Sequence, residues 1–532
     1  MPCFAAIDVG SNAIRLRIVE AEGPSPGAGA RVQLPLLPTE SAWREVASVR
    51  APVRLGGEVF LTGKLAPTSI GRACAAFKDF RREMDAAKVV AYRATATSAV
   101  REAANGTTLV ERARREAGID LEIIYGIEEA RLIQLAVTRR LALEDRRVLL
   151  IDVGGGSTEL TVLDKGQSSF SISLPLGSVR LLEAFMKDAT TVSKEMTRIV
   201  QEAVDRALVE ARPQLSRLTG AAFTAGGPDA LTLVGTGGNI ETLATLCPAK
   251  DRAPGELAAD VAEMRALFPK LCAMSPAERA RTYGLRPDRA DTIVPAAAIF
   301  LRIAESLGAS TIVTPQVGLK DGILEELVDK HFQVWDVLRE AENVLGACMR
   351  LGQRFQFDEA HGAHVARLAA RLFDDLHDEH QLSDRDRLLM RAAALLHDVG
   401  DFVRYDGHHK HSYYLIQNSD IMGLTPDERA IIANVARYHR KSGPDPSHPN
   451  FRDLDKESRG KVRALAAMLR IADALDREHL GKVRNVWATI ESGKGRVLLK
   501  IDGDHERELE EWTVRAKAGL FRDVFGLEIV IG

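Results

Sequence analysis

The sequence predicts an α/β protein with two similar domains around a cleft, followed by an all-α domain and a small α+β subdomain. Three observations lead to this prediction: an internal repeat in the first 315 residues, amphipathic helices beyond about residue 333, and alternating strands beyond about residue 483. A chain of 532 residues is also too long for one hydrophobic core. We expect domains at residues 1–126, 127–315, 316–482 and 483–532.

The repeat begins with two similar segments, AIDVG at residues 6–10 and LIDVG at residues 150–154. Their aspartates, Asp8 and Asp152, lie 144 residues apart, and the later apolar positions keep the same offset. Each copy is typical of a buried strand, a glycine turn and an outgoing strand with alternating apolar residues. Two unrelated strands that share a dipeptide are the alternative, but the matching offsets favour a repeat.

The composition excludes several classes of protein. A hydrophobic content of 45%, a charged content of 27% and a net charge of −3 are those of a globular protein, not of a disordered chain or a DNA coat. The five cysteines are scattered and never form a C-x-x-C pair, which indicates a reducing cytoplasm. The longest apolar run, residues 293–301, contains Pro295 and is far shorter than the ~20 residues of a membrane span. We expect a cytoplasmic protein without membrane or nucleic-acid partners.

The segment DVGGGSTE at residues 152–159 carries the strongest functional signal. Gly154, Gly155 and Gly156 follow a buried strand, so the backbone can approach a phosphate and direct N–H groups at its oxygens. Asp152 and Glu159 could both face the cleft as oxygen ligands for Mg²⁺. No Gly-Lys-Ser/Thr follows, which excludes a Walker loop. A tight hairpin with a surface aspartate is the alternative.

Two further glycine turns follow apolar strands. The first copy of the repeat continues with Ser11 and Asn12, whose side chains can form hydrogen bonds to a ligand. The segment VGTGGN at residues 234–239, which contains Gly237, precedes a helix whose N-terminus favours an anion. One such turn is a weak signal, but three in one two-domain body favour a phosphate-binding cleft.

A carboxylate lies in the first turn of the helix that begins near residue 128. Glu129 shares a face with Leu132, Ile133 and Ala136, and this face should be buried. Burial opposes ionisation, and such a group can act as a general base for water. A glutamate that only compensates the helix dipole is the alternative.

Two basic features could bind phosphate. Arg93 lies in a predicted strand before a hydroxyl-rich turn and could bind phosphate through two N–H groups. Residues 437–500 contain 15 Lys or Arg and 8 Asp or Glu, although the whole chain is slightly acidic. This surplus fits a polyanionic ligand, and an ordinary solvated helical face is the alternative.

The segments AIDVGSN, ATATSAVREAANG, EEARLI, LIDVGGGSTE and VGTGGNIETLA together resemble the exopolyphosphatase/guanosine pentaphosphate phosphatase (Ppx/GppA) family, in the family's order and over roughly the first 330 residues. The resemblance implies the two-domain fold of actin, sugar kinases and heat-shock ATPases. It also implies a homodimer that uses Mg²⁺ (or Mn²⁺) to remove the terminal phosphate of polyphosphate or of pppGpp.

The resemblance also implies roles for single residues. Glu129 matches the family's proposed general base, Asp152 and Glu159 its acidic metal-site residues, and Arg93 its phosphate-binding arginine. The family's phosphate loop matches Gly154, Gly155, Gly156 and Ser157. Residues 320–321 are Lys-Asp where the family usually has Arg-Glu, a departure that keeps the charge.

The helical part carries a second pattern. The residues His361, His397, Asp398 and Asp473 occur in an order that resembles the HD phosphohydrolase superfamily, where four such residues hold a divalent metal. Further histidines follow at positions 408, 409, 411 and 439, and imidazole with carboxylate is a plausible transition-metal site. In long members of the Ppx/GppA family, however, the resemblance implies that this helical domain forms a channel wall and a dimer element. We therefore expect contacts to the distal part of a polyanion from Arg437, Arg440 and Lys441.

Three functions remain open at this point: an exopolyphosphatase, a pppGpp 5′-phosphohydrolase of the stringent response, and an ATP-binding kinase-like or chaperone-like protein of the same fold. Glu129 near the phosphate loop favours water as the acceptor, and no sugar-site signature is apparent. The additional C-terminal domains and their basic surplus favour a long polyanion. We expect a phosphoric anhydride hydrolase, specifically a processive exopolyphosphatase, with pppGpp hydrolysis as the alternative.

Overall fold

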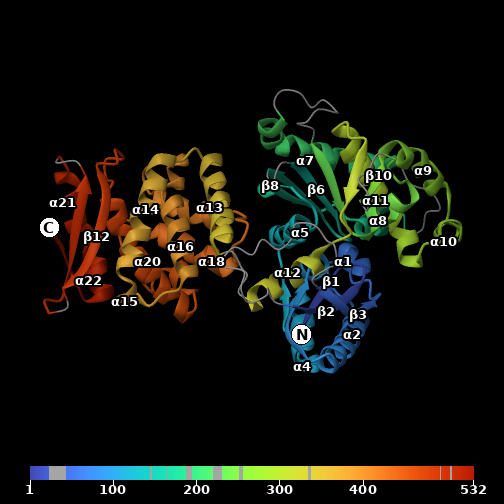
Figure 1. Cartoon of the computed structure of the whole chain (residues 1–532), viewed down its shortest axis with the longest axis horizontal. Helices are drawn as coiled ribbons and strands as arrows, with labels where there is room; N and C mark the ends of the chain where they lie inside the picture. Colours follow the sequence, from blue (N-terminus) through green and yellow to red (C-terminus); the bar gives the residue numbers. More distant parts are fainter. Residues whose placement is uncertain are drawn as a thin grey trace. The chain divides into compact units, whose positions relative to one another are not determined.

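Two β-sheets dominate the first part of the computed structural model (Figure 1). The first sheet has the order β3-β2-β1-β4-β5 and consists of β1 (Cys3–Val9), β2 (Ile14–Ala21), β3 (Trp43–Ala51), β4 (Val89–Ala96) and β5 (Leu121–Ile123). The second has the order β10-β11-β9-β6-β7-β8 and consists of β6 (Arg147–Val153), β7 (Thr158–Asp164), β8 (Gln167–Leu174), β9 (Thr232–Thr236), β10 (Leu257–Asp260) and β11 (Thr311–Thr314). The order β8-β7-β6-β9-β11 repeats β3-β2-β1-β4-β5, which confirms the predicted internal repeat.

The strand register places the two aspartates of the repeat at equivalent positions. Asp8 lies opposite Arg15 in the β1–β2 hairpin, and Asp152 lies opposite Glu159 in the β6–β7 hairpin. Almost every residue of β1 and β6 is buried, as expected for central strands covered on both faces. Because β1 pairs parallel with β4 and β6 pairs parallel with β9, the loops after these strands leave from the carboxyl edges of the sheets, where α/β proteins bind ligands.

Helices flank both sheets. They are α1 (Gly56–Thr62), α2 (Pro67–Ala86), α3 (Ser98–Glu102), α4 (Gly106–Ala117), α5 (Gly126–Arg140), α6 (Ser178–Phe185), α7 (Lys194–Thr219), α8 (Gly238–Leu246), α9 (Val261–Ala273), α10 (Pro276–Tyr283), α11 (Pro287–Ser306) and α12 (Leu319–His331). The apolar run at residues 293–301 lies in α11 and is buried in the core against the second sheet. Within the described ranges, no helix has the length and apolar character that a bilayer crossing requires.

The chain divides into two compact units, Met1–Trp335 and Asp336–Gly532. Helix α12 belongs to the first unit, because Leu319, Ile323 and Leu324 complete a buried cluster with Phe4 of β1 and Ile133 of α5. The sequence placed the start of the helical domain at residue 316, before this helix. The pattern of an amphipathic helix predicts that its apolar face is buried, but it does not show against which core the face packs.

The second unit, from here on the helical unit, contains α13 (Val337–Arg354), α14 (Glu359–Asp375), α15 (His377–His380), α16 (Asp384–Leu396), the 3-10 turn η1 (Val399–Phe402), α17 (His408–Gln417), α18 (Pro426–Arg437), α19 (Pro449–Arg452) and α20 (Lys456–Ala474). Its tail has the sheet order β12-β13-β14, with β12 (Val483–Glu491), β13 (Arg496–Gly503), α21 (Glu508–Lys517), α22 (Gly519–Phe525) and β14 (Glu528–Ile531). This tail is the α+β subdomain that the sequence predicts. The structure describes residues 1–22, 43–143, 146–164, 166–186, 194–219, 231–250, 256–332, 337–491, 493–503 and 506–532.

Candidate active site

A cleft of about 460 Å³ lies at the carboxyl edges of β1, β6 and β9. All three predicted glycine turns contribute to its wall. The predicted site residues that line it are Ser11, Asn12, Glu129, Asp152, Gly154, Gly155, Ser157 and Gly237. The structure therefore brings together residues that lie far apart in the sequence, as the repeat requires.

Three carboxylates form a cluster beside this cleft. Glu129 comes from the first turn of α5, Asp152 from the end of β6, and Glu159 from the paired position on β7. One oxygen of each lies within 4.8 Å of one oxygen of the other two. All three side chains are buried. The Oε2 atoms of Glu129 and Glu159 are buried and have no hydrogen-bond partner.

Burial and neighbouring carboxylates raise the pKa values of these carboxyl groups. The pKa of Glu129 is well above its ordinary value because of burial and the charges of Glu159 and Asp152. Burial and the neighbouring Asp152 raise the pKa of Glu159 to about 7, although Ser173 Oγ donates to Glu159 Oε1 at 2.8 Å. Burial raises the pKa of Asp152 to about 6, although Thr236 Oγ1 donates to Asp152 Oδ1 at 2.5 Å.

This donor set fits a hard divalent cation such as Mg²⁺. Mg²⁺ prefers carboxylate oxygens and retains several waters, so one or two protein carboxylates suffice to hold it. Two buried oxygens without partners are costly in the absence of a cation, because a buried charge needs a compensating charge or hydrogen bonds. The residues that would hold the ion are Asp152 and Glu159, with the free oxygen of Glu129 adjacent.

The glycine turns permit close backbone packing at the cleft wall. A side chain at Gly155 would place its Cβ 2.8 Å from the Cβ of Ser11, so only glycine fits where the two loops meet. Gly237 has φ +91° and stands directly before α8, so its left-handed backbone favours glycine and the helix N-terminus points toward the cleft. Ser11 Oγ lies 3.0 Å from Ser98 Oγ. Gly156 belongs to the same turn as Gly155.

Arg93 lies apart from the cleft residues. Its guanidinium donates to Glu122 Oε2 at 3.0 Å, to Glu128 Oε1 at 3.0 Å and to Glu326 Oε2 at 2.7 Å. Arg131 also donates to Glu128 and Glu326, which completes a network of two arginines and three glutamates. In β4, Arg93 lies two residues before Thr95, which pairs with Asp8. Arg93 is therefore set back from the carboxyl edge of the sheet, where the cleft lies. The network assigns Arg93 a structural role, and its predicted contact with phosphate stays a prediction.

The sequence missed five basic residues that line the cleft: Arg15, Arg50, Arg286, Arg289 and Lys320. Burial, together with Arg15 and Arg286, lowers the pKa of Arg289 to about 10, and its Nη1 donates to Asn239 Oδ1 at 2.6 Å. Burial lowers the pKa of Arg50 as well. Crowded guanidinium groups repel one another, so this part of the cleft favours a polyanion. The strand register could have identified Arg15 from the sequence, because Arg15 pairs with Asp8 in the β1–β2 hairpin.

In the helical unit, the four residues of the second pattern do come together. His361 lies near the start of α14, His397 and Asp398 directly follow α16, and Asp473 lies in the last turn of α20. The ligand atoms of His361, His397 and Asp473 lie within 4.8 Å of one another. The Oδ2 atom of Asp398 is 3.5 Å from His397 Nε2 and 3.8 Å from His361 Nε2.

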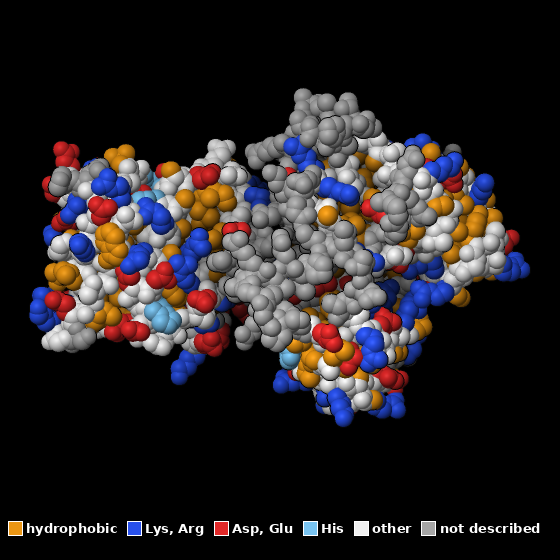
Figure 2. Space-filling view, in the orientation of Figure 1, with side chains coloured by type: hydrophobic (Ala, Val, Ile, Leu, Met, Phe, Trp, Pro, Cys, Tyr) orange, Lys and Arg blue, Asp and Glu red, His pale blue; other side chains and the backbone are white. Residues whose placement is uncertain are grey.

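The three predicted polyanion contacts lie together at the end of α18. Arg437 stacks over the ring of Tyr413, with 5.5 Å from its Cζ to the ring centroid. Arg440 Nη1 lies 3.3 Å from Nε2 of His408, and Lys441 is exposed. On the face of the helical unit shown in Figure 2, basic and acidic side chains are interspersed. That face therefore shows no single basic patch.

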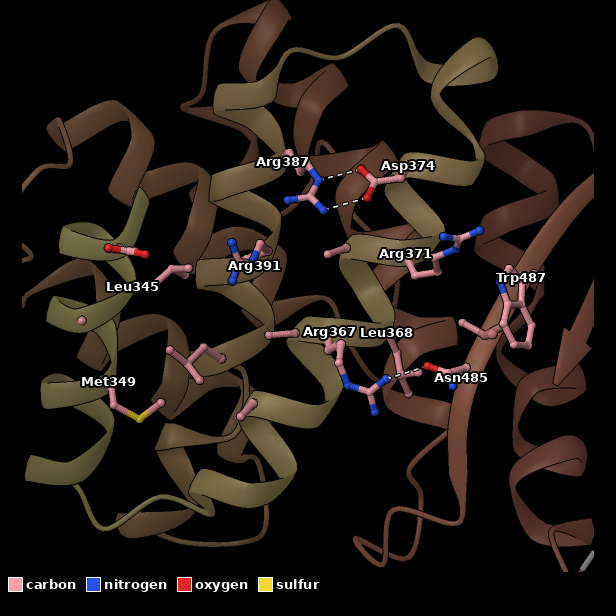
Figure 3. Close-up of a pocket in the computed structure, with 17 residues that line it drawn as sticks. Leu345, Met349, Arg367, Leu368, Arg371, Asp374, Arg387, Arg391, Asn485 and Trp487 are labelled. Carbon is pink, nitrogen blue, oxygen red and sulfur yellow. Dashed lines mark hydrogen bonds and ion pairs between the residues drawn. The ribbon is translucent and has the colours of Figure 1, made fainter. Parts of the chain in front are cut away.

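A second cavity, of about 910 Å³, lies among α13, α14, α16 and β12 (Figure 3). Its walls are mainly apolar, and four arginines line it: Arg367, Arg371, Arg387 and Arg391. Three of the four contact protein acceptors, since Arg387 pairs with Asp374, Arg371 with Asp375, and Arg367 with Asn485. Burial and the neighbouring Arg387 lower the pKa of Arg391. No local motif marks this cavity, because four separate elements form it.

The fold and the cleft define the class of protein: two actin-like α/β domains around a cleft lined by glycine turns, followed by a helical region. A model of the Ppx/GppA phosphatase family matches residues 39–331, and a model of Ppx/GppA phosphatase, domain III, matches residues 346–516. The chain belongs to the Ppx/GppA phosphatase family. Membership implies a hydrolase that acts on phosphoanhydrides.

Known relatives resemble the chain over most of its length. A guanosine-5′-triphosphate,3′-diphosphate pyrophosphatase of Aeromonas hydrophila is 25% identical over 477 residues, which are 88% of this chain and 87% of that protein. The protein of the same name from Photobacterium profundum is 24% identical over 442 residues, 83% of this chain and 81% of that protein. A crystal structure of an exopolyphosphatase from Cytophaga hutchinsonii is 24% identical, with a TM-score of 0.52, and covers 62% of this chain and 98% of its own. The last match shows a shared fold.

Proposed function

We propose that this protein is an exopolyphosphatase that removes the terminal phosphate of inorganic polyphosphate with Mg²⁺ (or Mn²⁺). The observation that carries the proposal is the cluster of Glu129, Asp152 and Glu159 beside a cleft with glycine turns and five basic side chains. Carboxylates alone would repel a polyphosphate. Carboxylates that hold a cation, in the same cleft as guanidinium groups, suit a chain of phosphates.

In the proposed reaction, a water oxygen attacks the terminal phosphorus and the bridging P–O bond breaks, which releases orthophosphate and a chain shorter by one phosphate. Glu129 accepts the proton of the water. Burial and the charges of Glu159 and Asp152 raise the pKa of Glu129, which makes its carboxylate a stronger base toward the water. Mg²⁺ bound at Asp152 and Glu159 would neutralise charge that develops on the phosphate oxygens. The N–H groups of Gly155, Gly156 and Ser157 and of Gly237–Gly238 orient the phosphate, whereas the Gly154 N–H donates to the carbonyl oxygen of Ser157 at 3.0 Å.

The choice of polyphosphate over pppGpp rests on the cleft wall. Among the lining residues that the structure describes, none is aromatic, whereas five are basic. A guanine base is commonly held by stacking on an aromatic ring, and an inorganic chain needs only cationic and N–H groups. The second candidate is pppGpp 5′-phosphohydrolysis, because relatives with that name match 81–88% of this chain, including the helical unit.

The decisive experiment measures orthophosphate release from long-chain polyphosphate and from pppGpp side by side, with the full chain and Mg²⁺. We expect kcat/KM for polyphosphate, per chain end, to exceed that for pppGpp by at least about tenfold. A preference of similar size for pppGpp would support the second candidate. Absence of release from both substrates would refute both proposals.

We also propose that Arg437, Arg440 and Lys441 contact the distal phosphates of a long chain. Each such contact should release counterions when polyphosphate binds. Replacing all three residues by alanine should therefore weaken the binding of long polyphosphate and reduce the salt dependence of its KM. Tripolyphosphate should be affected little. Arg391→Ala, a basic residue of the same unit, is the control. Equal losses for both substrates would contradict distal contacts.

The homodimer and the cytoplasmic location remain predictions, and light scattering of the purified chain tests the first.

A further inference from the structure

We propose that the cavity among α13, α14, α16 and β12 binds an organic monoanion with an apolar body, and that the guanidinium of Arg391 binds its charged group. The lining residues lie between positions 342 and 487, so the site belongs to the helical unit alone. Among the described lining residues, none belongs to the four-residue histidine–aspartate pattern or to the phosphoanhydride cleft. The proposal therefore does not depend on the proposed function.

Arg391 interrupts a buried apolar stretch of α16. From residue 388 to residue 396 it is the one charged side chain, and the other eight residues are apolar and buried. An apolar side chain would pack at this position at a lower cost than a guanidinium, which loses water when it is half-buried. Packing alone thus gives no reason for an arginine here.

The charge of Arg391 lacks a partner. Within the described part of the chain, no hydrogen bond or ion pair joins its guanidinium to an acceptor, and Figure 3 draws no dashed line at it. Arg387, one helix turn earlier, donates to the two carboxylate oxygens of Asp374 at 2.6 and 2.7 Å. Burial and the like charge of Arg387 lower the pKa of Arg391, although the charge of Asp374 opposes this shift. A half-buried cation without a partner is costly, and a bound anion would remove that cost.

The charges around the cavity indicate how many negative charges the ligand carries. Four arginines line the cavity, and Glu342 and Asp374 lie on its wall. A third carboxylate, Asp375, pairs with Arg371 from outside the wall. Among the described residues, four guanidinium groups thus stand against three carboxylates. Charge complementarity therefore favours a ligand with a single negative charge.

The apolar walls set the second requirement on the ligand. Leu345 and Met349, one turn apart on α13, line the cavity and remain partly exposed. Figure 3 shows them on one side of the cavity and Trp487 of β12 on the other. Because removal of apolar surface from water is favourable, an apolar ligand body gains free energy by binding between these walls. An inorganic polyphosphate has no such body.

The size and enclosure of the cavity favour a small molecule over a protein segment. Its volume of about 910 Å³ lies within the ~300–1,000 Å³ range of pockets that bind small organic molecules. A groove that binds a helix usually runs open along its length, whereas here a strand, β12, lines the cavity beside three helices. A second copy of the chain is the competing occupant, and the tests below distinguish it from a small molecule.

The first test uses two fluorescent probes with the same ring system. One is 1-anilinonaphthalene-8-sulfonate, a monoanion, and the other is N-phenyl-1-naphthylamine, which lacks the sulfonate. In titrations of the full chain, we expect one saturable site for the anionic probe. Its affinity should fall at least about tenfold in Arg391→Met, which keeps an unbranched apolar side chain and removes the charge. The affinity for the neutral probe should stay within about threefold of wild type.

The matched control is Arg463→Met, at an exposed arginine of the same unit that does not line the cavity. This variant should leave the affinities for both probes unchanged, because a surface charge outside the cavity makes no contact with the ligand.

The second test fills the cavity. Gly346 of α13 lines it, and a Cβ at this position would meet only Nη1 of the flexible Arg350 side chain, at 3.3 Å. Gly346→Leu replaces a glycine within a helix by a better helix former, so the fold should be retained. We expect this variant to weaken both probes at least about tenfold. Ala363→Leu, at an exposed position of the wall on α14, is the second blocking variant, and circular dichroism establishes that each variant is folded.

Each of the following results would overturn the proposal. Anion affinity that Arg391→Met leaves unchanged, or equal losses for both probes, would contradict recognition of the charge. Unchanged binding in both blocking variants, or absence of saturable binding, would contradict the site. Displacement of the anionic probe by excess tripolyphosphate would assign the cavity to an inorganic polyanion. Affinity that falls as the concentration of the chain rises would assign it to a second copy of the chain.

Discussion

Replacement of Glu129 by glutamine tests the proposed general base with the least change to the fold. The side chain keeps its volume, so the packing of α5 against the second sheet is preserved. The change removes a buried carboxylate whose charge is disfavoured by burial and by the neighbouring charges of Glu159 and Asp152. The variant should therefore be at least as stable as wild type in thermal unfolding.

The kinetic effect should be large. Glu129 Oε2 has no hydrogen-bond partner, so it is free to accept a proton, and an amide cannot take over this function. Loss of general-base catalysis costs roughly 10²–10⁴-fold in rate. The effect should fall on kcat with KM nearly unchanged, since the turns and the basic residues still bind phosphate.

The assay is continuous orthophosphate release from long-chain polyphosphate at saturating Mg²⁺. The matched control is Glu128→Gln, one position away in the same helix turn. Glu128 pairs with Arg93 and Arg131, so its replacement should lower stability and leave kcat within a few-fold of wild type. Activity of Glu129→Gln within a few-fold of wild type, or a loss that is larger in Glu128→Gln, would refute the assignment of the base.

Three further predictions concern the metal ligands, pH and stability. Asp152→Asn and Glu159→Gln should each raise the Mg²⁺ concentration for half-maximal activity, because a charged ligand becomes neutral, and identical Mg²⁺ titrations would contradict the site. At limiting Mg²⁺ activity should fall as pH drops through about 7 and 6, because the raised pKa values of Glu159 and Asp152 cause them to take up protons there, and saturating Mg²⁺ should shift the profile to lower pH. Glu326→Ala should lower the free energy of unfolding by about 3–5 kcal/mol in urea, because Arg93 and Arg131 lose a buried partner. That loss should shrink below the ordinary glutamate pKa of 4.5, since the pKa of Glu326 is lowered to about 2 and its contribution disappears as pH falls.

The sequence predicted the parts of the fold that local pattern and repetition determine. The two copies around Asp8 and Asp152 share register and sheet order because the same strand–turn–strand pattern folds in the same way twice. The place of α12 could not be predicted, because its apolar face packs on residues far away in the sequence.

The candidate site followed the same division. Glu129, Asp152 and the glycine turns lie next to strand ends, where periodicity locates them. Arg93 precedes the same type of turn, yet its neighbours in space are Glu122, Glu128 and Glu326, with which it forms ion pairs. Its contact with phosphate stays a prediction. Which basic side chains reach a cleft depends on tertiary geometry, and sequence spacing does not contain it.

The histidine cluster illustrates the limit most clearly. The sequence order of His361, His397, Asp398 and Asp473 predicted one group. His408 and His439 also lie near Asp398, with their Nε2 atoms 3.2 and 3.3 Å from its Oδ1. This proximity depends on how α17 and α18 pack, which sequence order does not show. Proximity in sequence also suggested His409 and His411, which do not belong to the groups of metal-ligating atoms found among the described residues.

The most direct test of the central claim is hydrolysis of polyphosphate in ¹⁸O-labelled water, with mass spectrometry of the released orthophosphate. Attack of water on the terminal phosphorus predicts one ¹⁸O atom in each orthophosphate from a first turnover and none in the remaining chain. Formation of labelled orthophosphate should require Mg²⁺. Over the same reaction time, Glu129→Gln should form almost none. Transfer of phosphate to another acceptor without labelled orthophosphate, or label at the end of the remaining chain, would contradict the account.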